Sequence, residues 1–306
     1  MVAGQRLGDC QQVGELRLLL RLLGCRCFVG RVRNSHRAIS LFVRARIFST
    51  YNTLFAMRTA KIGKHTVEMY DSIEDLPIVR FHKYNKMLLI DAGIGGDLSD
   101  VDSHIEKAAA FVRVGESQKA VDELQNLKKA VFFIMSGLAP KHLAFAALVT
   151  KVDGTETNDL SDDGLQRVVA MLNDTTNSEV VSELETAKKK IESELLTYFP
   201  QFFDSAVEKE YYDTIKKRTM AQLMNIISGK KDSENVDLLT DKILTFIDPP
   251  IFEGLENAEV KADKQFERML LIMSQQLGID ARGYSTLAFY NAYEYLNETL
   301  KKKQKK

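Results

Sequence analysis

The sequence predicts a mainly α-helical protein, a multi-helix bundle of about nine helices with a small β element near residues 64–70. Apolar residues recur every three or four positions over most of the chain after residue 72, which is the spacing of one buried helix face. Glycine and proline mostly stand between these periodic runs. One early stretch instead alternates apolar and polar residues, as a strand does.

The first elements follow from local spacing and from helix-ending residues. Residues 64–70 alternate and include β-branched side chains, so we expect a short strand there. A helix is expected to begin at Pro77, which suits a first helical turn, and to end at Gly93. The next helix is expected over residues 100–114, with Ser99 as its N-terminal cap.

The third helix has the most regular apolar stripe in this half of the chain. Its members follow the 4-3-4-3 spacing of a buried face, and we expect them to be buried: Ala120, Leu124, Leu127, Val131 and Ile134. Gly137 and Pro140 then separate this helix from another that is expected over residues 142–152.

The second half of the chain is expected to be entirely helical. Its longest pattern runs from Val180 to Tyr198, keeps a 3/4 alternation, and ends at Pro200. The other helices from residue 161 onward are expected at residues 161–173, 205–227, 235–247, 260–277 and 285–300.

Composition divides the chain into four segments. Residues 1–56 contain nine Arg and no Lys, whereas the remainder contains seven Arg and 26 Lys. Residues 57–174 are expected to form an N-terminal lobe with the strand and the first helices. The polar run at 174–178 separates it from a C-terminal helical lobe over residues 178–300, and residues 301–306 form a basic tail.

Three interpretations fit the first segment. It is an over-extended start that precedes a true first residue at Met57, a mitochondrial transit peptide, or a basic arm for nucleic acid or an anionic membrane. The apolar run Leu16–Leu23 is too short to span a bilayer and contains two Arg, so no transmembrane segment is expected. All three cysteines lie in this segment, so the remainder offers no thiolate ligand or Cys nucleophile.

The segment most like a ligand site is the glycine-rich turn at Gly93, Gly95 and Gly96, which follows an apolar run and precedes a helix. Such a turn presents backbone N–H groups to a phosphate in many nucleotide-binding proteins. The spacing departs from G-x-G-x-x-G because Leu98 holds the last place. We therefore favour a helix cap here and keep a small ligand- or nucleotide-binding enzyme as the alternative.

Metal and acid–base sites are weakly indicated. Residues 159–164 carry oxygen side chains followed by Gly, but Ala170 stands where a calcium loop needs its closing Glu, so a helix N-cap is favoured. Asp100 and His104 are four residues apart and can share a helix face, yet no further ligand is visible nearby. We therefore expect no metal site, no cofactor and no assembled catalytic residues.

Two groups of residues are candidates for contact with a partner. The first is the small basic and aromatic cluster Arg80, His82, Lys83, Tyr84 and Lys86. The second is part of the aromatic run near the C-terminus, in particular Tyr290 and Tyr293. The chain from Met57 has 33 basic and 40 acidic residues, and this acidic balance makes nucleic acid an unexpected partner.

Three stretches resemble a family of uncharacterised proteins encoded by tailed bacteriophages of gut bacteria. They read TVEMYDSIEDLPIVRFHKYNK at residues 66–86, LLIDAGIGGD at 88–97 and NDLSDDGL at 158–165. The resemblance covers roughly residues 64–170 and implies a virion-associated or assembly-related role. It transfers no catalytic residue, because the family has no known chemistry.

The sequence therefore favours a non-enzymatic structural or interaction protein that acts through protein–protein contacts. The expected partners are further copies of the chain or virion proteins. The phage resemblance places it in the virion or the host cytoplasm, whereas a transit peptide at residues 1–56 would place it in the mitochondrial matrix.

Overall fold

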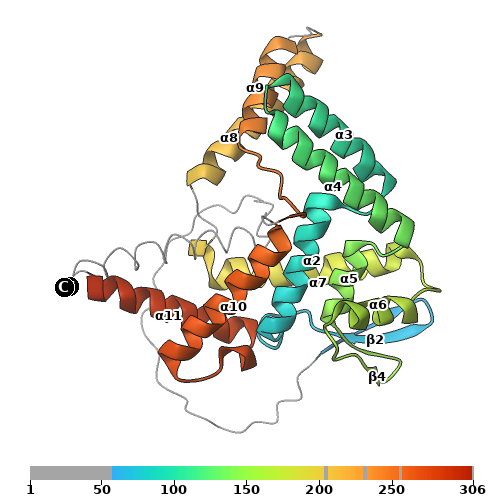
Figure 1. Cartoon of the computed structure of the whole chain (residues 1–306), viewed down its shortest axis with the longest axis vertical. Helices are drawn as coiled ribbons and strands as arrows, with labels where there is room; N and C mark the ends of the chain where they lie inside the picture. Colours follow the sequence, from blue (N-terminus) through green and yellow to red (C-terminus); the bar gives the residue numbers. More distant parts are fainter. Residues whose placement is uncertain (1–56, 203–205, 230–232, 255–256, 305–306) are drawn as a thin grey trace.

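The computed structural model describes residues 57–202, 206–229, 233–254 and 257–304. Within these ranges the chain forms ten α-helices and one four-stranded antiparallel sheet (Figure 1). The predicted fold class, mainly α with a small β element, is confirmed. The expectations about residues 1–56 lie outside the described residues.

The sheet has the strand order β1-β2-β3-β4, and its strands are Arg58–Ile62, His65–Met69, Val149–Val152 and Thr155–Glu156. Only β2 was expected. Residues 149–152 were expected to continue a helix, and this prediction was wrong. The helix ends at Leu148, and the strand that follows pairs with β2, with Val152 opposite Val67. Spacing within a short apolar run does not report a strand partner that lies far away along the chain.

The helices otherwise lie close to their expected positions. They are α2 (Ile78–Ile94), α3 (Leu98–Arg113), α4 (Ser117–Ser136), α5 (Pro140–Leu148), α6 (Asp162–Met171), α7 (Asn177–Tyr198), α8 (Ala206–Ser228), α9 (Ser233–Thr245), α10 (Ala258–Leu277) and α11 (Thr286–Gln304). Short 3₁₀ turns follow α7 and α10, at Pro200–Phe202 and Ala281–Gly283.

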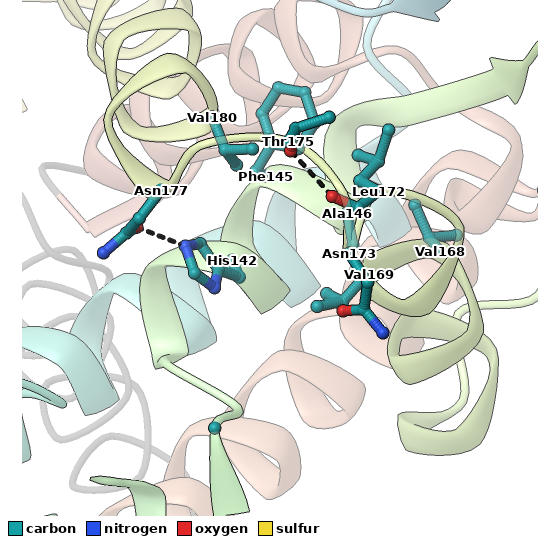
Figure 2. A pocket seen from close by; sticks show the side chains of 11 residues that line it. His142, Phe145, Ala146, Val168, Val169, Leu172, Asn173, Thr175, Asn177 and Val180 are labelled. Carbon is teal, nitrogen blue, oxygen red and sulfur yellow. Dashed lines mark hydrogen bonds between the residues drawn. The ribbon is translucent and has the colours of Figure 1, made fainter. Parts of the chain in front are cut away.

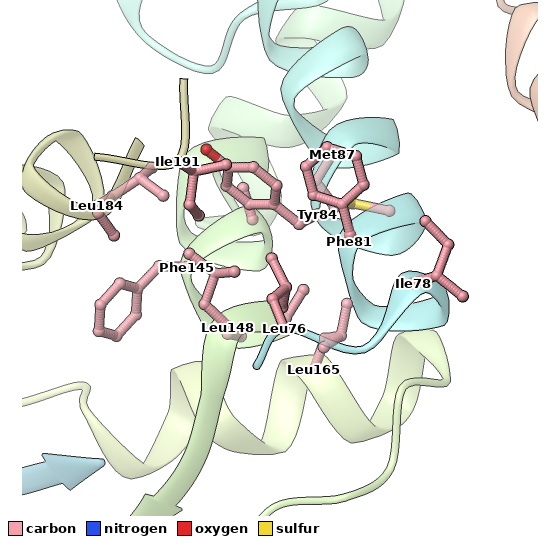
Figure 3. Packing of buried hydrophobic residues seen from close by; sticks show 14 of the residues in the cluster. Leu76, Ile78, Phe81, Tyr84, Met87, Phe145, Leu148, Leu165, Leu184 and Ile191 are labelled. Carbon is pink, nitrogen blue, oxygen red and sulfur yellow. The ribbon is translucent and has the colours of Figure 1, made fainter. Parts of the chain in front are cut away.

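The main core surrounds α2 and α5, which lie next to each other at its centre (Figure 3). Phe81 and Tyr84 of α2 are buried there with Leu184 and Ile191 of α7. The same cluster also takes side chains from α10 and α11. The polar run at 174–178 therefore does not divide the core, because residues on both sides of it contribute to one cluster.

A second and much smaller cluster lies at the other end of α3 and α4. Its buried members are Ala110, Phe111, Ala120 and Leu244. Figure 1 shows α3 and α4 side by side there, with α9 beside α3 and α8 against α9. At this end the four helices share few buried apolar side chains, whereas the other end of α4 contributes Ala130 to the large core.

The expected buried stripe of α4 is found only in part, because Ala120 is buried and Leu127 and Ile134 are half-buried. Leu124 and Val131, expected to be buried, are 50% and 39% exposed, while Glu123 and Asn126 are buried. The inward polar side chains hold the extended segment before α10 by its backbone: Lys119 donates to the Ile247 carbonyl, Asn126 to that of Pro250 and Lys129 to that of Phe252. A segment without regular structure needs donors for its buried carbonyls, which an apolar helix face cannot supply.

No single helix in the described ranges has the length and apolar composition to cross a membrane. Taken together, α4 and α5 meet that test by length and composition, but a bend of 68° separates them. Most of α5 is buried in the main core.

Candidate functional site

The glycine turn joins α2 to α3. Gly93 lies inside α2, where a Cβ atom would stand 2.6 Å from Phe252, so its role is close packing. The helix ends at Ile94, and its C-cap is Gly95, which has a φ of 71° and donates its N–H to the Asp91 carbonyl. The predicted helix cap at this turn is therefore present, two residues later than Gly93.

The backbone N–H groups of this turn already bind an anionic group of the chain itself, the side-chain carboxylate of Asp100. The backbone N–H groups of Gly96 and Asp97 both donate to one carboxylate oxygen of Asp100, at 2.8 Å each. Asp97 is the N-cap of α3, where Ser99 was expected, and Asp100 lies in the first turn of that helix. The carboxylate thus occupies the position that a ligand phosphate takes in nucleotide-binding turns.

A cavity of about 380 Å³ opens beside this turn. Four helix ends converge on it: the last turn of α2, the start of α3, the start of α5 and the start of α7. Its lining residues are Asp91, Gly96, Asp97, Ala139, Lys141, Asn177, Ser178 and Val181. The cavity is large enough for a small polar molecule.

Asp91, Asp97 and Lys141 are the charged residues that line this cavity. The Asp91 carboxyl is only 19% exposed, and burial raises its pKa to about 6, although the Lys141 ammonium opposes the rise. The Lys141 ammonium lies 4.0 Å from Asp91 and 3.8 Å from Asp97, so it contacts both carboxylates loosely. A carboxyl with a pKa of about 6 beside an ammonium group is suited to proton exchange or to binding a polar ligand.

A second, smaller cavity of about 130 Å³ shares Asn177 with the first (Figure 2). Its walls are mostly apolar and come from α5, α6 and α7. His142 Nε2 lies 2.6 Å from the Asn177 side-chain oxygen at its edge. The lining residues are Gly137, His142, Phe145, Ala146, Val168, Val169, Leu172, Asn173, Thr175, Asn177 and Val180.

The basic cluster predicted on α2 is used inside the fold. Arg80, His82 and Tyr84 are buried. Lys83 pairs with Asp162 at 2.6 Å, and Lys86 pairs with Asp263 at 2.9 Å. The cluster therefore does not present an exposed basic patch, because α2 is the central helix and its polar side chains meet partners on neighbouring segments.

His82 shows how these internal contacts are made. Its ring stacks on Phe266 of α10, with 3.9 Å between the ring centroids, and its Nε2 lies 2.9 Å from Asp263. The aromatic candidates of α11 are likewise internal, since Tyr290 and Tyr293 are 4% and 6% exposed. Within the late aromatic run it is Tyr295, at 63%, that faces outward.

The other sequence candidates are also structural. Ser161 caps α6 by accepting the Gly164 N–H, as the helix-cap interpretation of residues 159–164 predicted. Asp100 and His104 do not act together, because His104 instead pairs with Glu123. Among the described residues, no group of three or more acidic, His or Cys side chains has the arrangement of a metal site.

His65 joins three loops near the sheet. Its two ring nitrogens lie 2.6 Å from Asp153 and 2.7 Å from Asp174, and these hydrogen bonds raise the pKa of the imidazole. Asp153 has a φ of 50° in the β3–β4 turn and also accepts the Thr66 N–H. These hydrogen bonds connect the β1–β2 turn with the β3–β4 turn and with Asp174. They occupy both ring nitrogens of His65.

Sequence reasoning missed two features of the site and its surroundings. The first is the convergence of Asp91, Lys141 and Asn177, which are up to 86 positions apart and share no motif. The second is the outward apolar row of α4. The available signal in the sequence was the spacing of the polar residues Glu123 and Asn126, which are three positions apart and so share one side of the helix.

Comparison with known proteins adds no further information. No protein-family model, curated protein or solved structure matches the chain.

Proposed function

We propose that the protein is a non-enzymatic structural or interaction protein that binds other protein molecules through exposed helix faces. The resemblance to a phage family implies that these are virion or assembly partners. The observation that carries the proposal is the apolar stripe on the outer side of α4. Polar residues contribute much of the inward side of that helix, and a row of its apolar residues faces outward.

The outer stripe of α4 has the composition of a protein interface. Its members follow 3-7-1-3 spacing and are 39% to 82% exposed: Val121, Leu124, Val131, Phe132 and Met135. Gln125 and Lys128 are the exposed polar residues between them. Interface cores are depleted in charge and enriched in Phe and Met, and an α-helix presents such a row to a groove or to another helix.

The exposed apolar surface extends beyond α4. Leu98, Ile105 and Val112 of α3 recur at seven-residue intervals and are 76%, 50% and 63% exposed. Two neighbouring helices that each carry an exposed apolar row support a contact function more strongly than isolated exposed residues do.

We expect the full chain to form assemblies larger than the 34.6 kDa monomer and the α4 stripe to contribute to them. The double change Phe132→Ser and Met135→Ser should raise the apparent dissociation constant at least about tenfold, because it removes the two most exposed stripe residues. The melting temperature should change little, since neither side chain is buried. Sedimentation velocity over a range of concentrations measures the mass of the assemblies and their apparent dissociation constant.

The matched control is Leu196→Ser with Leu271→Ser, which removes similarly exposed apolar residues from α7 and α10. It should leave the assemblies unchanged. Identical mass distributions for the wild type and the α4 variant would count against this function.

Small-ligand binding in the Asp91 cavity is a second candidate, favoured by the raised pKa of that carboxyl. A carboxyl with an ordinary pKa of 3.8 and a folded pKa of about 6 lowers stability as pH rises through this interval. Asp91→Asn should therefore be more stable than the wild type at pH 8 by up to roughly 3 kcal/mol, and should not be more stable at pH 4. Urea unfolding at the two pH values measures the difference.

The control for this cavity is Asp102→Asn, which removes an exposed carboxylate of α3 that does not line the cavity. A polar ligand of the cavity should raise the melting temperature of the wild type and not that of Asp91→Asn. Equal stability of wild type and Asp91→Asn at both pH values would remove the basis for this candidate.

A further inference from the structure

Helix α8 exposes an apolar row along its C-terminal half. Met220, Leu223, Met224 and Ile227 follow 3-1-3 spacing and are 54%, 48%, 59% and 79% exposed. Among the described elements, α8 packs chiefly against α9, and α9 in turn contacts α3. One side of α8 is therefore occupied within the chain, while the side that carries this row is not covered by a described element.

Charge is distributed unevenly over this helical hairpin. Residues 214–231 contain five basic residues, and no Asp or Glu occurs among them: Lys216, Lys217, Arg218, Lys230 and Lys231. Lys216 and Lys217 are exposed and precede the apolar row on the same side of the helix, because they lie three or four residues before Met220. We call Lys216, Lys217 and the four apolar residues the basic face of α8.

Helix α9 has the opposite charge on its exposed side. Glu234, Asp237 and Asp241 are all exposed and share one side of the helix at 3-4 spacing. Leu238, which is 64% exposed, lies among them. These four residues form the acidic face of α9. Inside the hairpin the two helices already pair opposite charges, since Lys242 of α9 lies 3.2 Å from Glu210 of α8.

We propose that two copies of the chain join through these hairpins, with the basic face of α8 in one copy against the acidic face of α9 in the other. The proposal rests on the protein-contact function above and names the partner for this end of the molecule. A twofold axis parallel to the helices produces the contact twice, and the two hairpins together make a four-helix bundle.

A second copy fits better than an unrelated partner because the two complementary faces occur on the same hairpin. A single twofold contact satisfies both of them. Pairing of α8 with α8 in the same direction would instead place Lys216 and Lys217 of the two copies against each other, which is unfavourable. The small cluster around Phe111 and Leu244 supplies little burial at this end, so a four-helix arrangement also adds the apolar contacts that the hairpin lacks.

The positions of the charges along the hairpin agree with this geometry. Lys217 lies eleven residues before Ser228 at the end of α8, which corresponds to about 17 Å of helix. Asp241 lies eight residues after Ser233 at the start of α9, which corresponds to about 12 Å. When the tips of the two hairpins are aligned, each Lys217 is therefore within one helical turn of the level of an Asp241 in the other copy.

Charge reversal in the full chain tests the proposal. The first variant carries Lys216→Glu and Lys217→Glu, and the second carries Asp237→Lys and Asp241→Lys. The wild type should sediment as a dimer of the 34.6 kDa chain. Each variant alone places like charges across both contacts, so its dissociation constant should rise at least about tenfold. An equimolar mixture of the two variants restores opposite charges at both contacts and should recover dimers within about threefold of wild-type affinity.

Two further measurements test whether the variants remain folded and whether the apolar row also contributes to the dimer. Far-UV circular dichroism should show that both reversed variants keep wild-type helix content. Leu223→Ser with Met224→Ser should weaken the dimer, and mixing with either reversed variant should not restore it. A wild type that is monomeric at all concentrations, reversed variants that dimerise as the wild type does, or a mixture that fails to restore dimers would each overturn the proposal.

The same measurements separate this proposal from the function on which it rests. If assembly depends on Phe132 and Met135 but not on the α8 and α9 charges, the contact function stands and the hairpin dimer is wrong. If the hairpin charges control dimerisation and the α4 stripe has no effect, the dimer stands and the proposed role of α4 falls.

Discussion

Replacing Arg80 with Met should lower the free energy of unfolding by about 3–5 kcal/mol. Arg80 is 6% exposed, and its guanidinium donates to the carbonyls of Ala147, Val149 and Thr157 and to the Asn158 side chain, at 2.9 to 3.1 Å. Methionine fills much of the same space but leaves these buried acceptors without a donor. Urea unfolding measures the loss.

Arg80→Lys is the matched control, because it keeps the positive charge and removes the fork of donors. Burial lowers the pKa of the Arg80 guanidinium, and a lysine ammonium has less capacity to stay charged there. We expect Lys to recover less than half of the stability lost in the Met variant. A loss below about 1 kcal/mol for Arg80→Met would show that these acceptors find other donors.

Replacing Glu123 with Leu should cost a similar amount, about 3–5 kcal/mol, because it breaks a buried ion pair and leaves one partner. The His104 Nδ1 lies 2.8 Å from the Glu123 carboxylate, and the Nε2 lies 2.7 Å from the Ile94 carbonyl. Both side chains are less than 5% exposed. Since both ring nitrogens face acceptors, the ring is held as the cation, and it joins the end of α2 to α3 and α4.

The double variant His104→Phe with Glu123→Leu is the control for this pair. Replacing both partners leaves no unpaired buried charge, so we expect it to lose less stability than either single variant. A double-mutant cycle by urea unfolding measures the coupling between the two side chains. A double variant whose loss equals the sum of the two single losses would contradict the pairing.

The pH dependence of the pair has a definite sign. The hydrogen bond to Glu123 is the main cause that raises the pKa of His104 above its ordinary value of 6.5. The stability that this ionised pair contributes is complete below pH 6.5 and is lost as pH rises through the folded pKa. The stability of the wild type relative to the double variant should therefore fall as pH increases above that value.

The sequence alone was sufficient for most of the helices. Their positions depend on interactions between residues three or four apart and on caps such as Ser161 and Gly278, which are local properties of the chain. The strand at His65–Met69 was also visible, because its alternating pattern is complete within a few residues. The corresponding local signal at the glycine turn correctly favoured a cap.

The tertiary structure alone decided how these elements are used. Strand β3 exists because β2 pairs with it from about 80 positions away, and the α2 basic cluster is internal because its partners lie on other segments of the chain. The face of α4 that points inward depends on buried carbonyls at Pro250 and Phe252, more than 100 residues downstream. Local spacing determines whether a helix forms, but burial depends on which distant groups need hydrogen-bond partners, and these groups meet only in the folded chain.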